Sequence, residues 1–239
     1  MPVLIVRDNC PVCGGVGGEV RERLWKTCKD CRLVYQNLFT RLPEMEDLLA
    51  GIRRSFRTDK KINDGEFHFE EKRPSYTRRM KLHTKLAKVD DCVCEVGFGG
   101  SLILRLLREE GFQNLFGVEV VERYVLNAVR LGFQVYWKDL STGVPSYLPL
   151  MDCVFGNEMT EHVERPVDFL KGVRLITKSG GKAAFSFAVP DGRKKLSPSE
   201  WQYWRKESIE LVVKKAGWKI IELKMSSTTG FVWLLKDGK

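Results

Sequence analysis

Hydrophobic and polar residues alternate along the second half of the chain in a pattern that predicts a parallel sheet with helices between its strands. Short apolar runs, suited to buried strands, are separated by longer stretches with apolar residues at helical spacing. The runs cover residues 92–96, 115–119, 134–137, 152–156 and 182–188. Regular strand–helix alternation is typical of a doubly wound, Rossmann-like α/β fold.

Three helices and two further strands complete this prediction. The helices cover 102–110, 167–177 and 208–216, the last ended by Gly217. Residues 218–223 and 231–235 look like two final strands, which brings the predicted sheet to seven strands. Ligands of such sheets bind at the carboxyl ends of the strands, where the strand order reverses.

The first ninety residues follow a different pattern. No strand-like run interrupts 43–90, and residues 50–88 hold twelve Lys and Arg against five Asp and Glu, or +7 of the chain's net +9. This stretch is either a solvated basic helix face or a grip for phosphate groups of a substrate or of RNA. We therefore predict three parts: residues 1–42, a basic helical connector at 43–90, and the sheet domain at 91–239.

Length and composition indicate the number of domains and the cellular compartment that we expect. A chain of 239 residues can form one large domain with a small appendage. It contains no apolar run of the ~18 residues that a membrane helix requires, and no secretory leader pattern. We expect a soluble, cytoplasmic protein without a membrane span, whose seven cysteines are thiols or metal ligands.

Four of these cysteines form two Cys-x-x-Cys pairs, with fourteen residues between the pairs. Each pair can present two thiolates to one tetrahedral ion, a spacing typical of structural zinc. The predicted ligands are Cys10, Cys13, Cys28 and Cys31. A closed four-thiolate site leaves no coordination position for a substrate, so its expected role is in folding.

A glycine-rich turn follows the first strand of the sheet domain. It contains Glu95, Gly97, Gly99 and Gly100, and twenty residues after Gly99 comes Glu119 at the end of the next strand. Glycines allow a tight turn and close approach of a ligand, and an acidic residue at that distance suits ribose hydroxyls. This pattern predicts an adenosine-type cofactor.

Residues further along resemble the class I S-adenosylmethionine-dependent methyltransferases. The turn resembles that family's first motif, with Ser101 in its last glycine position. Lys138-Asp139-Leu140, Asn157-Glu158, Glu161-His162-Val163 and Lys178-Ser179-Gly180-Gly181 resemble later motifs in order. A nicotinamide dehydrogenase would share the turn alone. The resemblance implies that S-adenosylmethionine is bound by the residues Glu95, Gly97, Gly99, Gly100, Glu119, Asp139 and Asn157.

Two interpretations of the segment after the fourth strand stay open. His162 is a candidate base for an acceptor proton, or a structural histidine that orders the cofactor loop. Alternatively Glu158, Glu161 and His162 resemble the metal-binding residues of two O-methyltransferase groups, in which Mg or Mn would activate a hydroxyl. The predicted catalytic residues are thus His162, Glu161 and Glu158.

The sequence also leaves more than one class of molecule as the acceptor of the methyl group. Cys31-Arg32-Leu33-Val34-Tyr35-Gln36-Asn37 resembles the end of zinc ribbons that precede methyltransferase domains acting on sugars and other metabolites, with Arg32 in place of glycine. This favours a small, anionic metabolite or sugar-type acceptor. One alternative is an RNA methyltransferase that uses the basic connector and ribbon to hold RNA. The other is a cofactor-binding regulator without catalysis.

Overall fold

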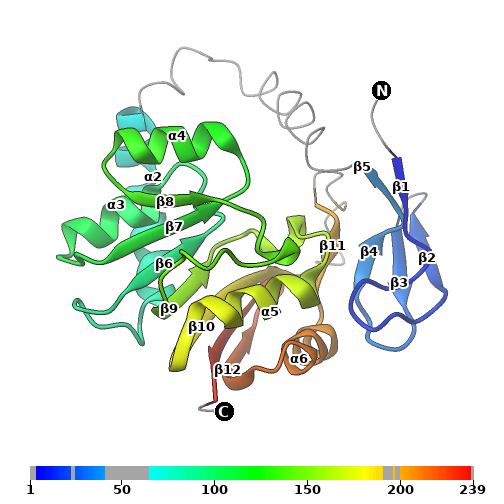
Figure 1. The fold of residues 1–239 in the computed structure, drawn as a ribbon. Helices are drawn as coiled ribbons and strands as arrows, with labels where there is room; N and C mark the ends of the chain where they lie inside the picture. Colours follow the sequence, from blue (N-terminus) through cyan, green and yellow to red (C-terminus); the bar gives the residue numbers. More distant parts are fainter. Residues whose placement is uncertain (1–3, 23–24, 41–64, 191–195, 197–199, 238–239) are drawn as a thin grey trace.

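The computed structural model describes residues 4–22, 25–40, 65–190, 196 and 200–237, which form a large α/β domain beside a small β domain (Figure 1). The large domain is built on a seven-stranded sheet with the order β12-β13-β10-β9-β6-β7-β8. Its strands are β6 (Val93–Val96), β7 (Leu115–Glu119), β8 (Gln134–Trp137), β9 (Met151–Gly156), β10 (Thr177–Ala188), β12 (Lys219–Met225) and β13 (Thr229–Leu235).

The direction and order of the strands indicate at which edge of the sheet a ligand is expected to bind. β13 is antiparallel to both of its neighbours, and the other pairs are parallel. The chain starts at β6, runs outward to β7 and β8, and returns to β9 on the other side of β6. The order therefore reverses between β6 and β9, and a crevice is expected at their carboxyl ends.

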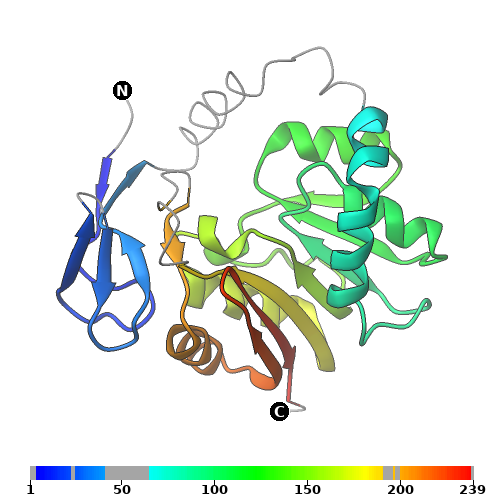
Figure 2. The same cartoon turned by 180° about the vertical axis from the view of Figure 1, so that it is seen from behind.

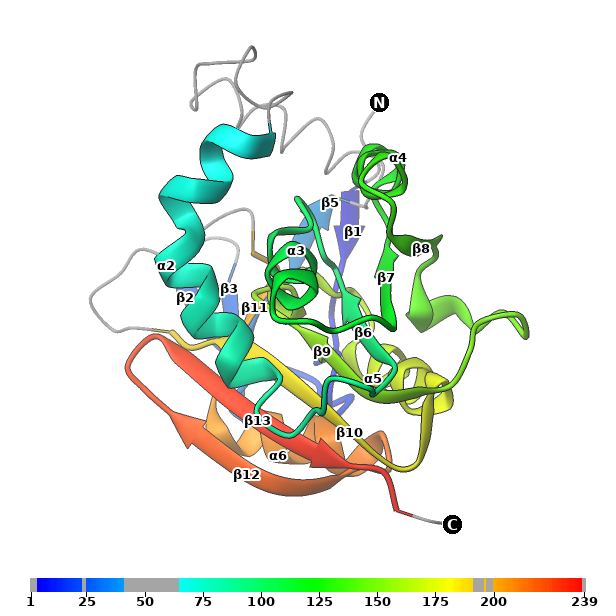
Figure 3. The same cartoon turned by 90° about the vertical axis from the view of Figure 1, so that its left-hand side faces the viewer.

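Helices cover both faces of the sheet (Figure 3). One face packs against α2 (Gly65–His83), α3 (Leu102–Glu109) and α4 (Glu122–Arg130), through a core that includes Met80, Leu104 and Phe155. The other packs against α5 (Pro166–Ile176) and α6 (Lys206–Lys215), through a core that includes Phe169, Phe185 and Val212. Two 3₁₀ turns, η1 (Leu140–Thr142) and η2 (Thr160–His162), follow β8 and β9.

The small domain contains β1 (Leu4–Val6), β2 (Gly18–Glu22), β3 (Trp25–Cys28), β4 (Val34–Gln36) and β5 (Leu38–Thr40). β1 pairs with β5, and β2, β3 and β4 form an antiparallel sheet. A fourth strand of that sheet is β11 (Gln202–Tyr203), which comes from the far end of the chain and pairs with β4. Figures 1 and 2 show β11 lying between the two domains.

The predicted α/β fold and seven-stranded sheet are confirmed. Two elements differ from expectation. β10 begins at Thr177 and takes in the Lys178–Gly181 turn as an irregularity, because its register against β9 shifts between Thr177 and Lys182. Most of the described part of the connector, residues 65–90, is α2, which covers the sheet as one of its own helices. The three-part division stays a prediction. Among the described helices, none is long and apolar enough to cross a membrane.

Candidate functional site

The glycine turn after β6 bends sharply around the carboxyl end of the sheet. Gly97 and Gly99 have φ of 70° and 50°, and Ser101, just before α3, has φ of 59°. A Cβ added at Gly99 would meet nothing within 4 Å, so this side of the backbone is open. Left-handed backbone favours glycine, which explains the residue type at the first two positions.

A cavity of about 320 Å³ lies against this turn. It is bounded by the ends of β6 and β7, by η1 and by the segment around η2. Its lining includes Val96, Gly97, Gly99, Val118, Glu119, Val120, Val121, Tyr124, Lys138, Asp139, Leu140, Ser141, Glu158, Met159, His162, Val163, Glu164 and Phe169. The wall is mainly apolar, with carboxylates placed at separate points. This is the usual character of a small-molecule site.

Glu119 anchors the polar side of the cavity. Its carboxylate, although buried, accepts hydrogen bonds from the backbone N–H groups of Gly99 at 3.0 Å, Val120 at 2.7 Å and Val121 at 3.1 Å. These bonds tie the glycine turn to the end of β7. A carboxylate has about four acceptor positions, so it can also receive a ligand hydroxyl.

Asp139 reaches the cavity from the start of η1. Its Oδ1 accepts a hydrogen bond from the backbone N–H of Ser141 at 2.8 Å, which fixes the orientation of the carboxylate. Glu119 ends β7, and Asp139 follows the end of the neighbouring strand β8 by two residues, so the two acids enter the cavity from different strands. Glu119 suits a ribose diol and Asp139 suits an adenine amino group, with apolar side chains between them. The residues therefore fit an adenosyl cofactor.

The other residues predicted to bind the cofactor lie differently. Glu95 is buried on the strand β6 but does not line the cavity; burial, together with the nearby Glu119, raises its pKa well above the usual range. Asn157 points toward α2, where its Oδ1 lies 3.2 Å from His83 Nε2. Gly100 is exposed beside Leu102. The cofactor roles of these three residues stay predictions.

The predicted catalytic trio does not converge. Glu158 pairs with Arg79, with 2.6 Å between the carboxylate and guanidinium. Glu161 is 4% exposed and lies outside the cavity lining, whereas Glu158 and His162 both line the cavity. Among the described residues, the only group of His, Cys, Asp and Glu side chains close enough to share an ion is the cysteine cluster. The geometry therefore does not fit a Mg or Mn site at Glu158, Glu161 and His162.

Part of α2 lies near this site; it belongs to the basic stretch that the sequence offered as a phosphate-binding segment, but its contacts with the site were not predicted. Arg79 meets Glu158, and its guanidinium lies 5.2 Å from the centre of the Tyr76 ring. His83 is fully buried beside Asn157, and burial lowers its pKa to about 4, so it is neutral. The spacing of 76, 79 and 83 places all three on one helix face, which was the available signal.

The four cysteine side chains of the small domain do converge. Their sulfur atoms all lie within 4.8 Å of one another, with 3.5 Å between Cys10 and Cys31 and 3.4 Å between Cys13 and Cys28. Sulfurs bound at ~2.3 Å to one tetrahedral ion would be roughly 3.8 Å apart. The hydrogen bond from Cys31 lowers the pKa of Cys10 to about 5, which favours a thiolate. The cluster fits a zinc ion.

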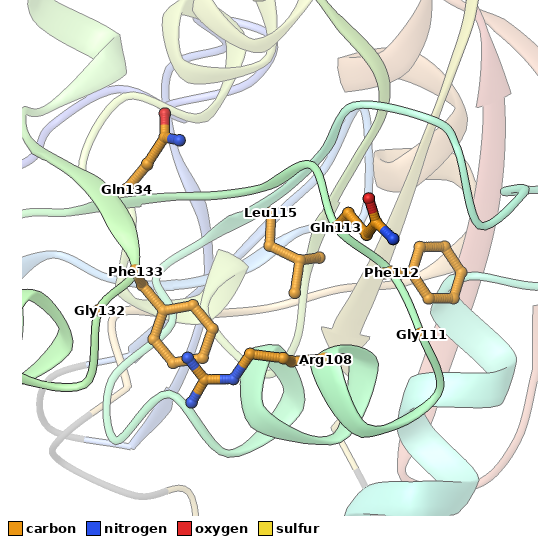
Figure 4. A pocket seen from close by; sticks show the side chains of 8 residues that line it. All are labelled: Arg108, Gly111, Phe112, Gln113, Leu115, Gly132, Phe133 and Gln134. Atoms are coloured by element: carbon orange, nitrogen blue, oxygen red, sulfur yellow. The ribbon is translucent and has the colours of Figure 1, made fainter.

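A second cavity, of about 380 Å³, lies at the opposite ends of the strands β7 and β8 (Figure 4). Its one charged lining residue, Arg108, lies over the Phe133 ring at 4.2 Å and donates a hydrogen bond to the Leu131 carbonyl at 2.9 Å. The amino ends of parallel strands are not where such sheets bind ligands. We assign no function to this cavity.

No family model and no curated protein matches the sequence. Solved structures do match. A S-adenosylmethionine-dependent methyltransferase from Thermotoga maritima is 16% identical, with a TM-score of 0.58 over 74% of this chain and 96% of that one. Magnesium protoporphyrin IX methyltransferase from Synechocystis, with bound S-adenosylmethionine, is 13% identical, with a TM-score of 0.54 over 78% and 91%.

The [4+2]-cyclase SpnF is also similar, at 14% identity and a TM-score of 0.59 over 68% of this chain and 81% of that one. A cyclase among these matches illustrates that the fold alone does not fix the reaction. The sheet order, the glycine turn and these likenesses agree on the architecture. The chain has the fold of the S-adenosylmethionine-dependent methyltransferases, preceded by a four-cysteine domain.

Proposed function

We propose that this protein is a S-adenosylmethionine-dependent methyltransferase that acts on a small anionic acceptor and carries a structural zinc ion. The observation that supports this best is the cavity at the sheet's reversal point, where Glu119 and Asp139 face one space beside an open glycine turn. Cofactors of this class place an adenosine and an amino acid in such a crevice. The similar folds support the same cofactor.

Each wall of the cavity has a separate task in this proposal. Glu119 holds the ribose hydroxyls, Asp139 holds the adenine amino group, and the glycine turn lets the backbone approach the ligand. The bound cofactor supplies an electrophilic methyl group on a sulfonium. The chain aligns the acceptor with that group and excludes water, which is where most of the rate gain of a displacement arises. His162 lines the cavity and is our candidate to receive an acceptor proton.

Arg79 supports the choice of an anionic acceptor. From α2, with about a third of its side chain exposed, it pairs with Glu158, which lines the cavity. A carboxylate or phosphate on the acceptor could bind the planar guanidinium through two hydrogen bonds. Glu158 has φ of 48°, and its N–H donates to Ser186 Oγ at 2.7 Å. Left-handed backbone in a non-glycine residue is typical of binding and catalytic sites.

No described feature favours RNA over a small acceptor. Two basic side chains on and after α2 are paired within the fold: Arg73 with Glu70 and Glu109, and Lys85 with Glu222. The basic residues in the first part of the 50–88 stretch lie outside the described residues: Arg53, Arg54, Arg57, Lys60 and Lys61. RNA binding therefore stays an alternative prediction.

Cofactor binding is the first test. Titration calorimetry with S-adenosylhomocysteine should show one saturable site, and Glu119→Ala should abolish it, because the change removes the ribose acceptor and leaves three backbone N–H groups unpaired. Glu122→Ala, on the exposed side of α4, is the matched control and should bind normally. Absence of binding to the unaltered protein would refute the proposal.

The acceptor class is tested with pairs of compounds that differ only in carrying a carboxylate or phosphate, assayed with labelled S-adenosylmethionine. Arg79→Ala should raise KM for the anionic member roughly 10- to 100-fold and leave cofactor affinity unchanged. Lys81→Ala, exposed on α2, should change neither. Equal use of the neutral members would contradict the anionic acceptor. Cofactor binding with no transfer to any compound or RNA would favour the regulator instead.

A further inference from the structure

The two domains share a strand. β11 has only two residues, and it forms the outer strand of the small domain's sheet by pairing with β4, Gln202 opposite Tyr35 and Tyr203 opposite Val34. Next to it, the backbone N–H of Gln36 donates to the Trp201 carbonyl at 2.8 Å, and Gln36 Nε2 donates to the Glu200 carbonyl at 2.8 Å. The position of residues 200–203 is therefore set by the four-cysteine domain.

The opposite side of this segment donates hydrogen bonds to residues 160–163, next to and within the wall of the cofactor cavity. Gln202 is fully buried, and its Nε2 donates to the carbonyls of Thr160 at 2.8 Å and Val163 at 2.9 Å. Trp201 N–H donates to the Glu161 carbonyl at 2.9 Å. Two carbonyl acceptors require two N–H donors, so a side-chain amide is well suited to position 202 and a carboxylate is not.

The segment that is held in this way lines the cavity directly. Met159, His162, Val163 and Glu164 are all in its wall. Arg7, from the small domain, adds a further tie by donating from Nη2 to the Glu164 carbonyl at 2.5 Å. A single 3₁₀ turn has few hydrogen bonds of its own, so the shape of this wall depends on partners outside it.

We propose that Gln202 is a positioning residue through which zinc binding by the four cysteines sets the affinity of the cavity for its cofactor. Zinc orders the turn that runs from Cys28, at the end of β3, to Cys31, ahead of β4. β4 holds β11, and Gln202 on β11 holds the η2 wall. This inference rests on the proposed cofactor, and it goes beyond that proposal by giving the metal a role in ligand binding.

The test uses the full-length, zinc-loaded protein and S-adenosylhomocysteine as the probe. Gln202→Met keeps the side chain's length and removes both hydrogen bonds, so affinity should fall about tenfold while zinc content stays at one per chain. Hydrogen exchange at the amides of His162 and Val163 should accelerate. Lys215→Ala is the matched control: Lys215 Nζ contacts the Cys13 carbonyl at 3.3 Å but does not reach the cavity wall, so affinity should be unchanged.

Zinc removal supplies the second arm. Chelation of the unaltered protein should weaken binding by at least as much as Gln202→Met, and chelation of the variant should add less than the sum of the two effects. Thermal melts of each sample show whether the sheet domain stays folded. The inference is overturned if the zinc-loaded variant binds like the unaltered protein, or if the two effects add fully. Absence of binding to the unaltered, zinc-loaded protein would instead refute the proposed function.

Discussion

Two residues with left-handed backbone stand where the resembling motifs have glycine. They are Arg32 and Ser101, and their φ values are 61° and 59°. Such backbone costs an ordinary residue roughly 1 kcal/mol relative to glycine. The glycine in those motifs is therefore a backbone preference that other residues can meet at a small loss of stability. The match of motif to position holds although the residue type differs.

Glu161 carries a pH-dependent contribution to stability. Burial raises the pKa of its carboxyl to about 8. Because the folded state retains this proton at pH values where the unfolded chain releases it, stability is full below pH ~4.5 and falls as the pH rises to about 8. Glu161→Gln removes this loss, so the variant should be more stable than the unaltered protein by about 1–3 kcal/mol at pH 9 and by little at pH 5.

Urea denaturation at pH 5, 7 and 9 measures this difference. Glu207→Gln, on the exposed side of α6, is the control and should not alter the slope of stability against pH. An equal stability difference at all three pH values would show that Glu161 does not retain a proton in the folded protein.

At the scale of elements, the part of the cavity lined by Asp139 and Leu140 depends on a close contact between α5 and η1. A Cβ at Gly172 would lie 2.2 Å from the Leu140 carbonyl oxygen, too close for any contact. Gly172→Ala should therefore displace η1 and Asp139 at its start. We expect a loss of about 1–3 kcal/mol in unfolding free energy, despite alanine's better helix propensity, and roughly tenfold weaker S-adenosylhomocysteine binding.

Thermal denaturation and calorimetry on the same samples separate the two effects. Lys171→Ala, one residue earlier and exposed on α5, should leave both unchanged. If Gly172→Ala folds and binds normally, then η1 tolerates movement and its contact with α5 does not shape the cavity.

The elements that the sequence predicted correctly are those with a periodic apolar pattern. β6, β7, β8, β9 and the three predicted helices, α3, α5 and α6, agree with expectation within a few residues. Burial on both faces gives central parallel strands such as β6 and β9 a continuous apolar run. β11 was not predicted, because two residues carry no period; its conformation comes from β4. The position of α2 was missed for a related reason: its exposed, mainly polar surface resembles a connector.

The residues of the candidate site also fall into those that the sequence predicted and those whose contacts it did not. Glu119, Asp139 and the glycine turn were predictable because each follows a strand end that the pattern locates. The partners of Glu158 and Glu161 were not, because Arg79 and Trp201 lie far away in sequence. Proximity in the chain suggested one metal-binding trio, whereas in the structure Glu158 and His162 line the cavity and the buried Glu161 does not.

At the scale of the whole molecule, the pairing of β4 with β11 joins residue 34 to residue 203. During synthesis, the four-cysteine domain emerges first and can bind its metal early, but its sheet has an open edge at β4 until residues 202–203 leave the ribosome. Open strand edges favour pairing with other chains. The last strand of the small domain's sheet is thus synthesised after most of the large domain. The open edge at β4 is therefore covered only once most of the large domain has been made.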